Sequence, residues 1–206
     1  MINIHFRQFR SRVAAAATSL LAVLACTISL QTIANATPQD AAVLYEDALG
    51  RFEKNDVAGA IIQLKNALQQ DQKMLAAHLL LGKALLRNGD LKAAEAAFEE
   101  AQSQGVSRAE LVLPLGSIYL ALGRPQQVIE RIPASGLPAA LQVEVLTMRG
   151  NAYVEAGNAG LATQSFAEAR QLDPTSVSPL IAEIPMLISA GELAHARANA
   201  DQAVAL

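Results

Sequence analysis

Side chains that could carry catalytic or metal chemistry are few in this sequence, and they lie far apart along it. The three histidines are His5, His78 and His195, and Cys26 is the one cysteine. A zinc site or a nucleophile and its base need such side chains at characteristic spacings, and no such cluster with carboxylates is present. We therefore expect no enzyme, no metal site and no cofactor. We expect His78 to be packed and His195 to be exposed.

Two stretches could bind an anion. The sequence GNAGLA at residues 157–162 has the glycines of a phosphate-binding loop, but it lacks the lysine and the serine or threonine that complete such a loop. Lys83 and Arg87 are four residues apart, which places both cations on one face of a helix. They could bind a carboxylate there, and the simpler alternative is that both are solvated near Glu53.

The elements that position these residues are predicted to be helices. Alanine, leucine, glutamine, glutamate and lysine favour helices, whereas strands are rich in β-branched and aromatic residues. Aromatic residues make up only 4% of the 206 residues, and tryptophan is absent. The composition therefore predicts an all-α protein whose helices pack through small residues.

The first 36 residues have the organisation of an export signal. Three arginines, at positions 7, 10 and 12, precede an apolar stretch at residues 13–30, and Ala34-Asn35-Ala36 supplies a small-x-small cleavage motif. We expect cleavage after Ala36 and a short linker at residues 37–40. Export places the remaining chain outside the cytoplasm, most simply in a bacterial periplasm.

Two alternatives for this segment stay open. The stretch AVLAC matches the end of a bacterial lipoprotein signal, which would leave a lipid on Cys26, but the residues after Cys26 stay apolar where a lipoprotein usually turns polar. An uncleaved anchor is the other alternative, at the short end of the length that a membrane span needs. Both alternatives also place the chain outside the cytoplasm.

Removal of the signal changes the charge balance. The signal holds three basic residues and no acidic one, so 13 basic residues face 19 acidic ones in the remaining chain, a net charge of −6. Nucleic acids and anionic lipids bind clustered lysine and arginine. We therefore expect neither as a partner, and membrane contact only through a lipid on Cys26. Without a mature cysteine the fold has no disulfide, so packing must stabilise it.

The strongest pattern in the sequence is a repeat of 34 residues. Five units cover residues 41–74, 75–108, 109–142, 143–176 and 177–206, the last incomplete. Small residues recur at position 8 (Ala48, Gly82, Gly116, Gly150) and alanine or valine at position 20 (Ala60, Ala94, Val128, Ala162, Ala196). Small residues there would let two helices of a unit nearly touch, while larger ones at positions 11 and 24 fill the adjacent space. A turn at positions 15 and 16, mostly glycine and then a polar residue, separates the two helices.

Four prolines modify this pattern. Pro125 falls in the first turn of a second helix, where proline is tolerated, and Pro133 should end that helix early. Pro114 and Pro185 fall inside first helices, where the lost backbone hydrogen bond is expected to delay or kink the helix.

This pattern over residues 41–206 resembles that of the tetratricopeptide repeat family. The resemblance implies antiparallel helix pairs stacked into a right-handed superhelical solenoid, in which neighbouring units stabilise one another. The fifth unit stops at position 30 without a polar capping helix. We expect the sequence to be the front part of a longer array, and the alternative is a final helix pair that docks on a partner.

The resemblance also implies a concave groove, lined by first-helix positions 2, 5, 9, 12 and 13, that binds a protein or peptide. The groove candidates are apolar with a few polar side chains: Tyr45, Phe52, Leu79, Lys83, Leu86, Arg87, Leu113, Ser117, Leu120, Thr147 and Asn151. Lys83 and Arg87, with Asn151, partly match the carboxylate clamp of some members, but most other clamp positions carry apolar residues or serine.

A narrower resemblance comes from AIIQLKNALQQD at residues 60–71 and LLLGKALLRNGDLKAAEAAFEEA at residues 79–101, behind an export signal. These stretches are similar to the periplasmic tetratricopeptide (lipo)protein of the PEP-CTERM/exosortase system. The resemblance implies a scaffold in exopolysaccharide export and protein sorting, with export components as partners. The alternatives are a general envelope-assembly module, for pili, outer-membrane proteins or a polysaccharide synthase, and the repeat part of a longer glycan-modifying enzyme.

Overall fold

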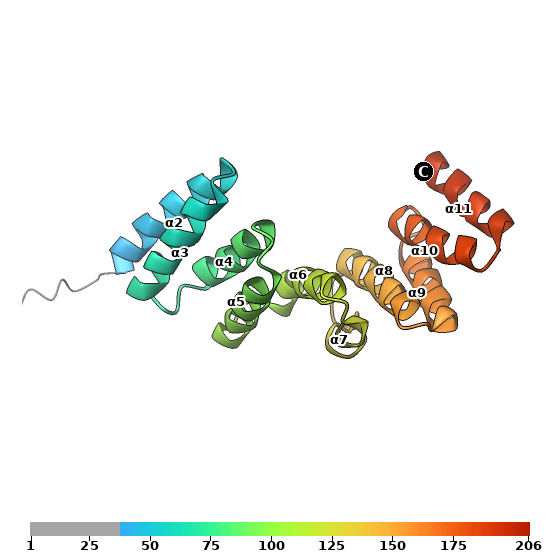
Figure 1. Ribbon diagram of the computed structural model, residues 1–206, viewed down its shortest axis with the longest axis horizontal. Helices are drawn as coiled ribbons and strands as arrows, with labels where there is room; N and C mark the ends of the chain where they lie inside the picture. Colours follow the sequence, from blue (N-terminus) through green and yellow to red (C-terminus); the bar gives the residue numbers. More distant parts are fainter. Residues whose placement is uncertain (1–37) are drawn as a thin grey trace, which may run out of the picture. The chain divides into compact units, whose positions relative to one another are not determined.

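The computed structural model describes residues 38–206, which form ten helices and no strand (Figure 1). The helices are α2 Pro38–Glu53, α3 Val57–Gln70, α4 Leu75–Arg87, α5 Leu91–Gln104, α6 Arg108–Ala121, α7 Pro125–Arg131, α8 Ala139–Glu155, α9 Ala159–Leu172, α10 Ser178–Ser189 and α11 Leu193–Ala205. None of these helices is long and apolar enough to cross a membrane. The predicted export signal, with Cys26, lies outside the described residues.

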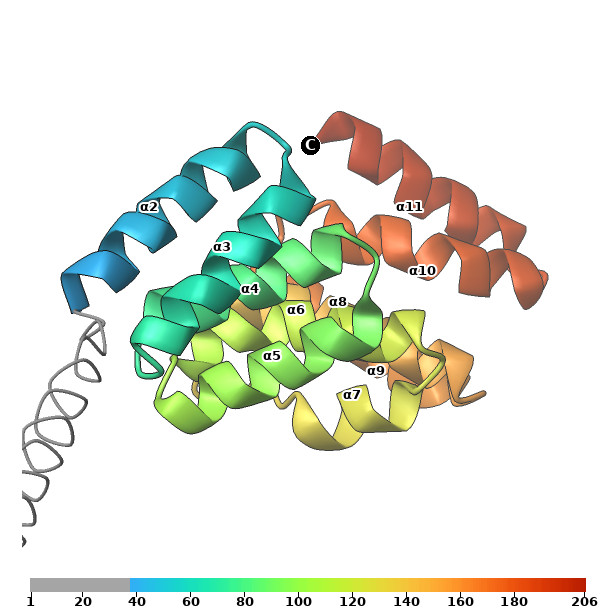
Figure 2. The ribbon, with the colours of Figure 1, turned by 60° about the vertical axis from the view of Figure 1, so that its left-hand side comes forward.

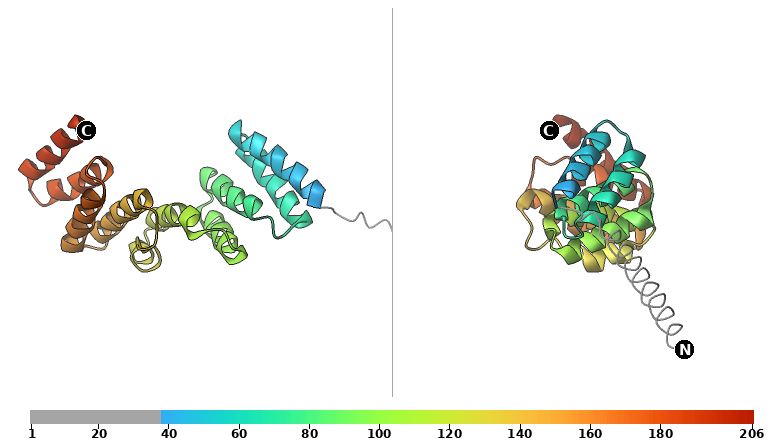
Figure 3. Two further views of the ribbon diagram at one scale, coloured as in Figure 1. Left: turned by 180° about the vertical axis from the view of Figure 1, so that it is seen from behind. Right: turned by 90° about the vertical axis from the view of Figure 1, so that its left-hand side faces the viewer.

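The helices are arranged as five consecutive pairs. Within each pair the two helices pack on each other, and each pair contacts the next, as α3 does α4 and α9 does α10. First helices also meet across pairs, as α8 and α10 do. Figures 2 and 3 show this succession from other directions. The prediction of an all-α repeat solenoid is confirmed.

The two helices of a pair meet at the small residues of the repeat. Ala60, Ala94 and Ala162, at position 20 of their units, are fully buried. In the second and fourth units the position-24 side chains, Phe98 and Phe166, are also fully buried and lie against the position-8 glycine of the partner helix. In these two units, positions 8 and 24 therefore provide both the close approach of the helices and the side chain that fills the adjacent space.

The turns between paired helices follow the sequence in most units. The glycines at position 15 of the second to fifth units have positive φ, and Asn55 takes that conformation in the first with φ 64°. The Asp56 carboxylate accepts a hydrogen bond from the Gly59 amide at 3.0 Å, and the Asn158 side chain accepts one from the Leu161 amide at 3.3 Å. Asp90 makes no such cap, because its carboxylate accepts from the Asn88 side chain instead.

The third pair is irregular where the prolines predict it. Helix α7 ends at Arg131, two residues before Pro133. Arginines from both neighbouring first helices bind the carbonyl groups at this early end. Arg149 of α8 donates to the Ile129 oxygen at 2.6 Å and to the Ile132 oxygen at 3.2 Å, and Arg108 of α6 donates to the Pro133 oxygen. Helix α8 then begins at Ala139, four residues before the predicted start of the fourth unit.

Of the two effects expected of Pro114 and Pro185, a delayed start of the helix does not occur. Both lie inside continuous helices, α6 and α10, which begin at Arg108 and Ser178. A proline removes one N–H group, and the remaining hydrogen bonds of the helix with the packing of its apolar face keep these helices intact.

Candidate functional site

The first helices present a row of half-buried side chains that includes most of the sequence-predicted groove residues. Six apolar or aromatic members of that set pack against the core and remain partly exposed: Tyr45 and Phe52 on α2, Leu79 and Leu86 on α4, Leu113 and Leu120 on α6. Burial raises the pKa of the Tyr45 phenol, and the neighbouring Glu46 carboxylate adds to this shift. Tyr45 is therefore a neutral hydrogen-bonding group at the surface of α2.

Five of the predicted residues come together in one pocket between α6 and α8. Its volume is about 550 Å³. The predicted members are Leu113, Ser117 and Leu120 from α6, with Thr147 and Asn151 from α8. The repeat register thus brings together residues that are up to 38 positions apart in the sequence.

Pro114, Met148 and Ser178 also line this pocket and were not among the predicted site residues. Pro114 and Met148 share position 6 of their units, next to the predicted position 5. Both residues could have been predicted from this shared repeat position. Met148 lies close to Gly116, where a Cβ would come within 2.1 Å of its sulfur, so its side chain reaches across from α8 to α6.

The polar groups of the pocket differ in what they can offer a ligand. Thr147 is buried and donates to the Val143 oxygen at 2.8 Å, and Ser117 donates to the Pro114 oxygen at 2.9 Å, so both hydroxyl protons are used within their own helices. Asn151 is half-buried and Glu144 is exposed, and neither side chain has a partner in the described part of the chain. The pocket therefore has apolar walls with one free amide and one free carboxylate.

Lys83 and Arg87 lie outside this pocket, on α4. The Arg87 guanidinium lies 3.7 Å from the centroid of the Phe52 ring, and its Nη1 donates to the Phe52 carbonyl oxygen at 3.0 Å. Arg87 thus binds the end of α2, while Lys83 is exposed and makes no ion pair with a described residue. The lining of the α6–α8 pocket includes Asn151 and neither cation. The carboxylate clamp remains a prediction, and Lys83 is its available cation.

The isolated histidines are placed as the sequence predicts. His78 is buried, and its Nε2 lies 2.8 Å from the Gln72 carbonyl oxygen. His195 is exposed, with its Nδ1 2.9 Å from a Glu192 carboxylate oxygen. Among residues 38–206 no group of three histidine, cysteine, aspartate or glutamate side chains is placed to hold a metal ion.

Comparison with protein families shows which family this arrangement represents. Residues 5–183 match the tetratricopeptide repeat-like domain family. The chain belongs to this family. The match begins inside the predicted export signal and does not test whether that signal is cleaved. Among curated proteins, none is similar enough in sequence to match the chain.

Solved structures of the tetratricopeptide fold are similar to this chain at low sequence identity. YrrB, described as a TPR protein with an unusual peptide-binding site, is 18% identical with a TM-score of 0.58, over 78% of this chain and 83% of YrrB. MamA from Desulfovibrio magneticus RS-1 is 15% identical with a TM-score of 0.67, over 81% and 94% of the two chains. A tetratricopeptide repeat protein from Parabacteroides merdae is 19% identical with a TM-score of 0.67, over 81% and 66%. At these identities the likeness establishes the fold.

Proposed function

We propose that this protein is a non-catalytic scaffold that binds a peptide segment of a protein partner along its first helices. The observation that carries this proposal is the α6–α8 pocket, in which five groove residues predicted from the repeat register meet. Tetratricopeptide repeat proteins bind protein or peptide partners, and YrrB is one whose description names a peptide-binding site.

The chemistry of the pocket suits an apolar side chain next to a peptide backbone. Leu113, Leu120 and Met148 offer apolar surface whose removal from water favours binding. The Asn151 amide can both donate to and accept from a peptide group. Glu144 at the exposed edge favours a basic residue next to the apolar one, and no lysine or arginine lines the pocket to oppose it.

We further propose that the scaffold works outside the cytoplasm, in PEP-CTERM/exosortase-linked exopolysaccharide export and protein sorting. The organisation of residues 1–36 as an export signal and the resemblance of residues 60–71 and 79–101 support this location. In this proposal the partners are exopolysaccharide-export components or sorted proteins, and lipidation of Cys26 is the alternative to cleavage after Ala36.

Photo-crosslinking in living cells tests both parts of the proposal. A photoreactive residue replaces Leu113 or Ser117 in the pocket, and, as a control, Lys92 on the exposed side of α5. Mass spectrometry then identifies what is captured. We expect capture of a tailed secreted protein or an exopolysaccharide-export component at the two pocket positions and not at Lys92.

The other outcomes separate the alternatives. Capture of pilus or outer-membrane assembly factors at the pocket would keep peptide binding and replace the pathway by general envelope assembly. Glycan alone at these positions, or equal capture at Lys92, would overturn peptide binding in the pocket. In the expected case an Asn151→Ala variant should reduce the captured amount about tenfold, because it removes hydrogen bonds to the peptide.

A further inference from the structure

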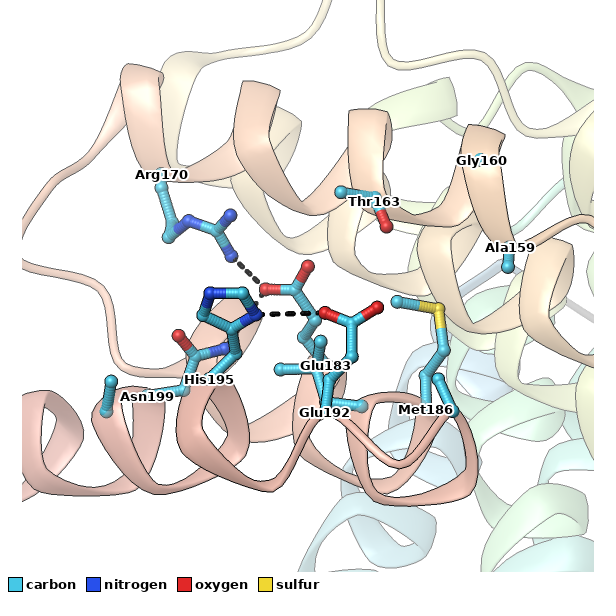
Figure 4. Close-up of a pocket in the computed structure, with 12 residues that line it drawn as sticks. Ala159, Gly160, Thr163, Arg170, Glu183, Met186, Glu192, His195 and Asn199 are labelled. Atoms are coloured by element: carbon cyan, nitrogen blue, oxygen red, sulfur yellow. Dashed lines mark hydrogen bonds and ion pairs between the residues drawn. The ribbon is translucent and has the colours of Figure 1, made fainter.

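A second pocket lies between α9, α10 and α11, and its chemistry differs from that of the α6–α8 pocket. Its volume is about 500 Å³. Figure 4 shows Ala159, Thr163 and Arg170 along α9 on one side of the pocket. Glu183, Met186, His195 and Asn199, from α10 and α11, face them from the other side. None of the residues proposed above to bind a peptide lines this pocket.

The pocket contains a buried carboxylate that is only half used. Glu183 is 4% exposed, and its Oε2 accepts from Arg170 Nη1 at 2.5 Å and from Asn199 Nδ2 at 3.0 Å. Both hydrogen bonds end on the same oxygen, so within the described chain Oε1 accepts none. A carboxylate withdrawn from water is costly unless its oxygens are bound. Oε1 is therefore an open acceptor in an otherwise buried group.

The repeat register shows that this position accepts an apolar residue as well as a charged one. Glu183 occupies position 7 of its unit, where the second and third units carry Leu81 and Leu115 and the first and fourth carry Asp47 and Arg149. Leu115 is buried, and Leu81 packs on the core. A leucine at position 183 would fill the same space without the cost of burying a charge. A charge at this position therefore also occurs elsewhere in the array, and Glu183 stands out because it is buried while one of its two oxygens stays unbound.

The register also explains why the pocket is open. At position 17 the first and second units carry Val57 and Leu91, whereas the fourth carries Ala159. At position 21 they carry Ile61 and Glu95, and Glu95 is bound to Arg124 at 3.0 Å. The fourth unit has Thr163 there. Smaller side chains on α9 therefore leave the space in front of Glu183 unfilled.

The charges around this space favour a cation. Two carboxylates, Glu183 and Glu192, line it together with one permanent cation, Arg170, which is already bound to Glu183. Glu192 lies at the exposed rim beside His195. We propose that this pocket binds a lysine or arginine side chain of a protein partner. The methylene groups of that side chain pack along Met186 and Leu187, as long basic side chains do on apolar surfaces, and its charged head binds Glu183 Oε1 and Glu192.

An NMR titration of the ¹⁵N-labelled protein tests the proposal. The probe is a capped tripeptide with lysine between two alanines, and the matched control peptide has norleucine, which keeps the methylene stem and lacks the charge. We expect shift changes at the amides of residues 159–163 and 183–199 with the lysine peptide and none with the norleucine peptide. Equal changes with both peptides would overturn a charge-recognising site. Shift changes with free 1,5-diaminopentane but not with the lysine peptide would overturn a protein side chain as the ligand.

Variants separate the pocket from general attraction to a negatively charged surface. Ala159→Leu places in α9 the side chain that Leu91 provides at the same position of the second unit, and it should abolish the shift changes while the melting temperature stays the same or rises. Glu183→Gln should weaken binding about tenfold, because it removes a hydrogen bond between charged groups. Should that variant fold poorly, Glu192→Gln at the exposed rim gives the same test with a smaller loss.

The control for these variants is Glu168→Gln, an exposed acid on α9 whose carboxylate accepts from Gln164 and lies outside the pocket. Binding should be unchanged in this variant. Undiminished binding by Ala159→Leu, or an equal loss with Glu168→Gln, would overturn the proposal. Neither result would bear on peptide binding at the first helices.

Discussion

The ring of Phe98 on α5 lies so close to Gly82 on α4 that a Cβ on this glycine would come within 2.6 Å of it. The same contact recurs in the fourth unit, where a Cβ on Gly150 would come within 2.4 Å of the Phe166 ring. Both rings are fully buried. The aromatic ring therefore fits because the facing residue has no side chain, and each of these units depends on this pair for the approach of its helices.

Gly82→Ala should destabilise the protein. Inside a helix, alanine raises the free energy of unfolding by about 0.5–1 kcal/mol relative to glycine. Overpacking of a filled core lowers it by about 1–3 kcal/mol, so we expect a net loss of stability of about 1 kcal/mol. Denaturant unfolding followed by circular dichroism measures it. Gly50→Ala on α2 is the control, because a Cβ there meets nothing within 4 Å, and it should raise stability by about 0.5–1 kcal/mol. Equal effects at both positions would contradict the close contact.

Ala94→Arg should unfold part or all of the repeat array. Ala94 is fully buried between α4 and α5, so a long charged side chain there both overpacks the interface and buries an unpaired charge. We expect a loss of about 3 kcal/mol or more. Thermal melting of the helical circular dichroism signal measures this loss. The adjacent Ala93 is exposed, and Ala93→Arg should leave the melting temperature nearly unchanged.

Arg87→Ala should weaken the attachment of α2 to α4. The Arg87 guanidinium stacks on Phe52 and donates to its carbonyl oxygen, and an exposed contact of this kind is worth about 0.5–1 kcal/mol. We expect a loss of about 1 kcal/mol, seen most clearly as faster hydrogen exchange in α2. Lys83→Ala, four residues earlier on the same helix, should have little effect on stability. A larger loss with Lys83→Ala would show that the two cations have the opposite roles.

The stability contributed by Asp56 should depend on pH. The amide of Gly59 and, next, the side chain of Arg51 lower the pKa of Asp56 below 3.8, the ordinary value for this carboxyl. Since the pKa is lower in the folded state, the contribution is complete above the unfolded-state value and is lost as the pH falls through the folded-state value. Asp56→Asn keeps an oxygen for the cap and removes the charge. The variant should therefore melt below the original protein at pH 7, and the difference should shrink as the pH falls below 3.8.

Asp90→Asn is the matched control for this pH effect. Asp90 stands at the same position of the second unit, but its side chain makes no cap bond to the helix that follows. The exchange removes the same charge, so any general effect of net charge appears in both variants. A pH dependence of equal size in the two would show that the Asp56 cap is not its source.

Much of the fold could be predicted from the sequence, because the helices and turns of each repeat depend on residues that are close together in the sequence. Small residues at positions 8 and 20, and glycine at position 15, specify helix contacts and turns within 34 residues. The repeat positions predicted to line the groove include five residues that the structure brings into one pocket: Leu113, Ser117, Leu120, Thr147 and Asn151. Met148 was missed because the predicted groove positions included position 5 and not the adjacent position 6, and its reach to Gly116 depends on how α8 packs on α6.

The sequence by itself determined the helical repeat and the turns, since these depend on residue type and spacing. Only the tertiary structure decided how individual charges are used. Arg87 binds α2, Arg149 and Arg108 bind the carbonyl groups left free by the short α7, and Glu183 is buried between three helices. Long polar side chains reach several candidate partners from one position in a repeat, and the packing of neighbouring units selects among them.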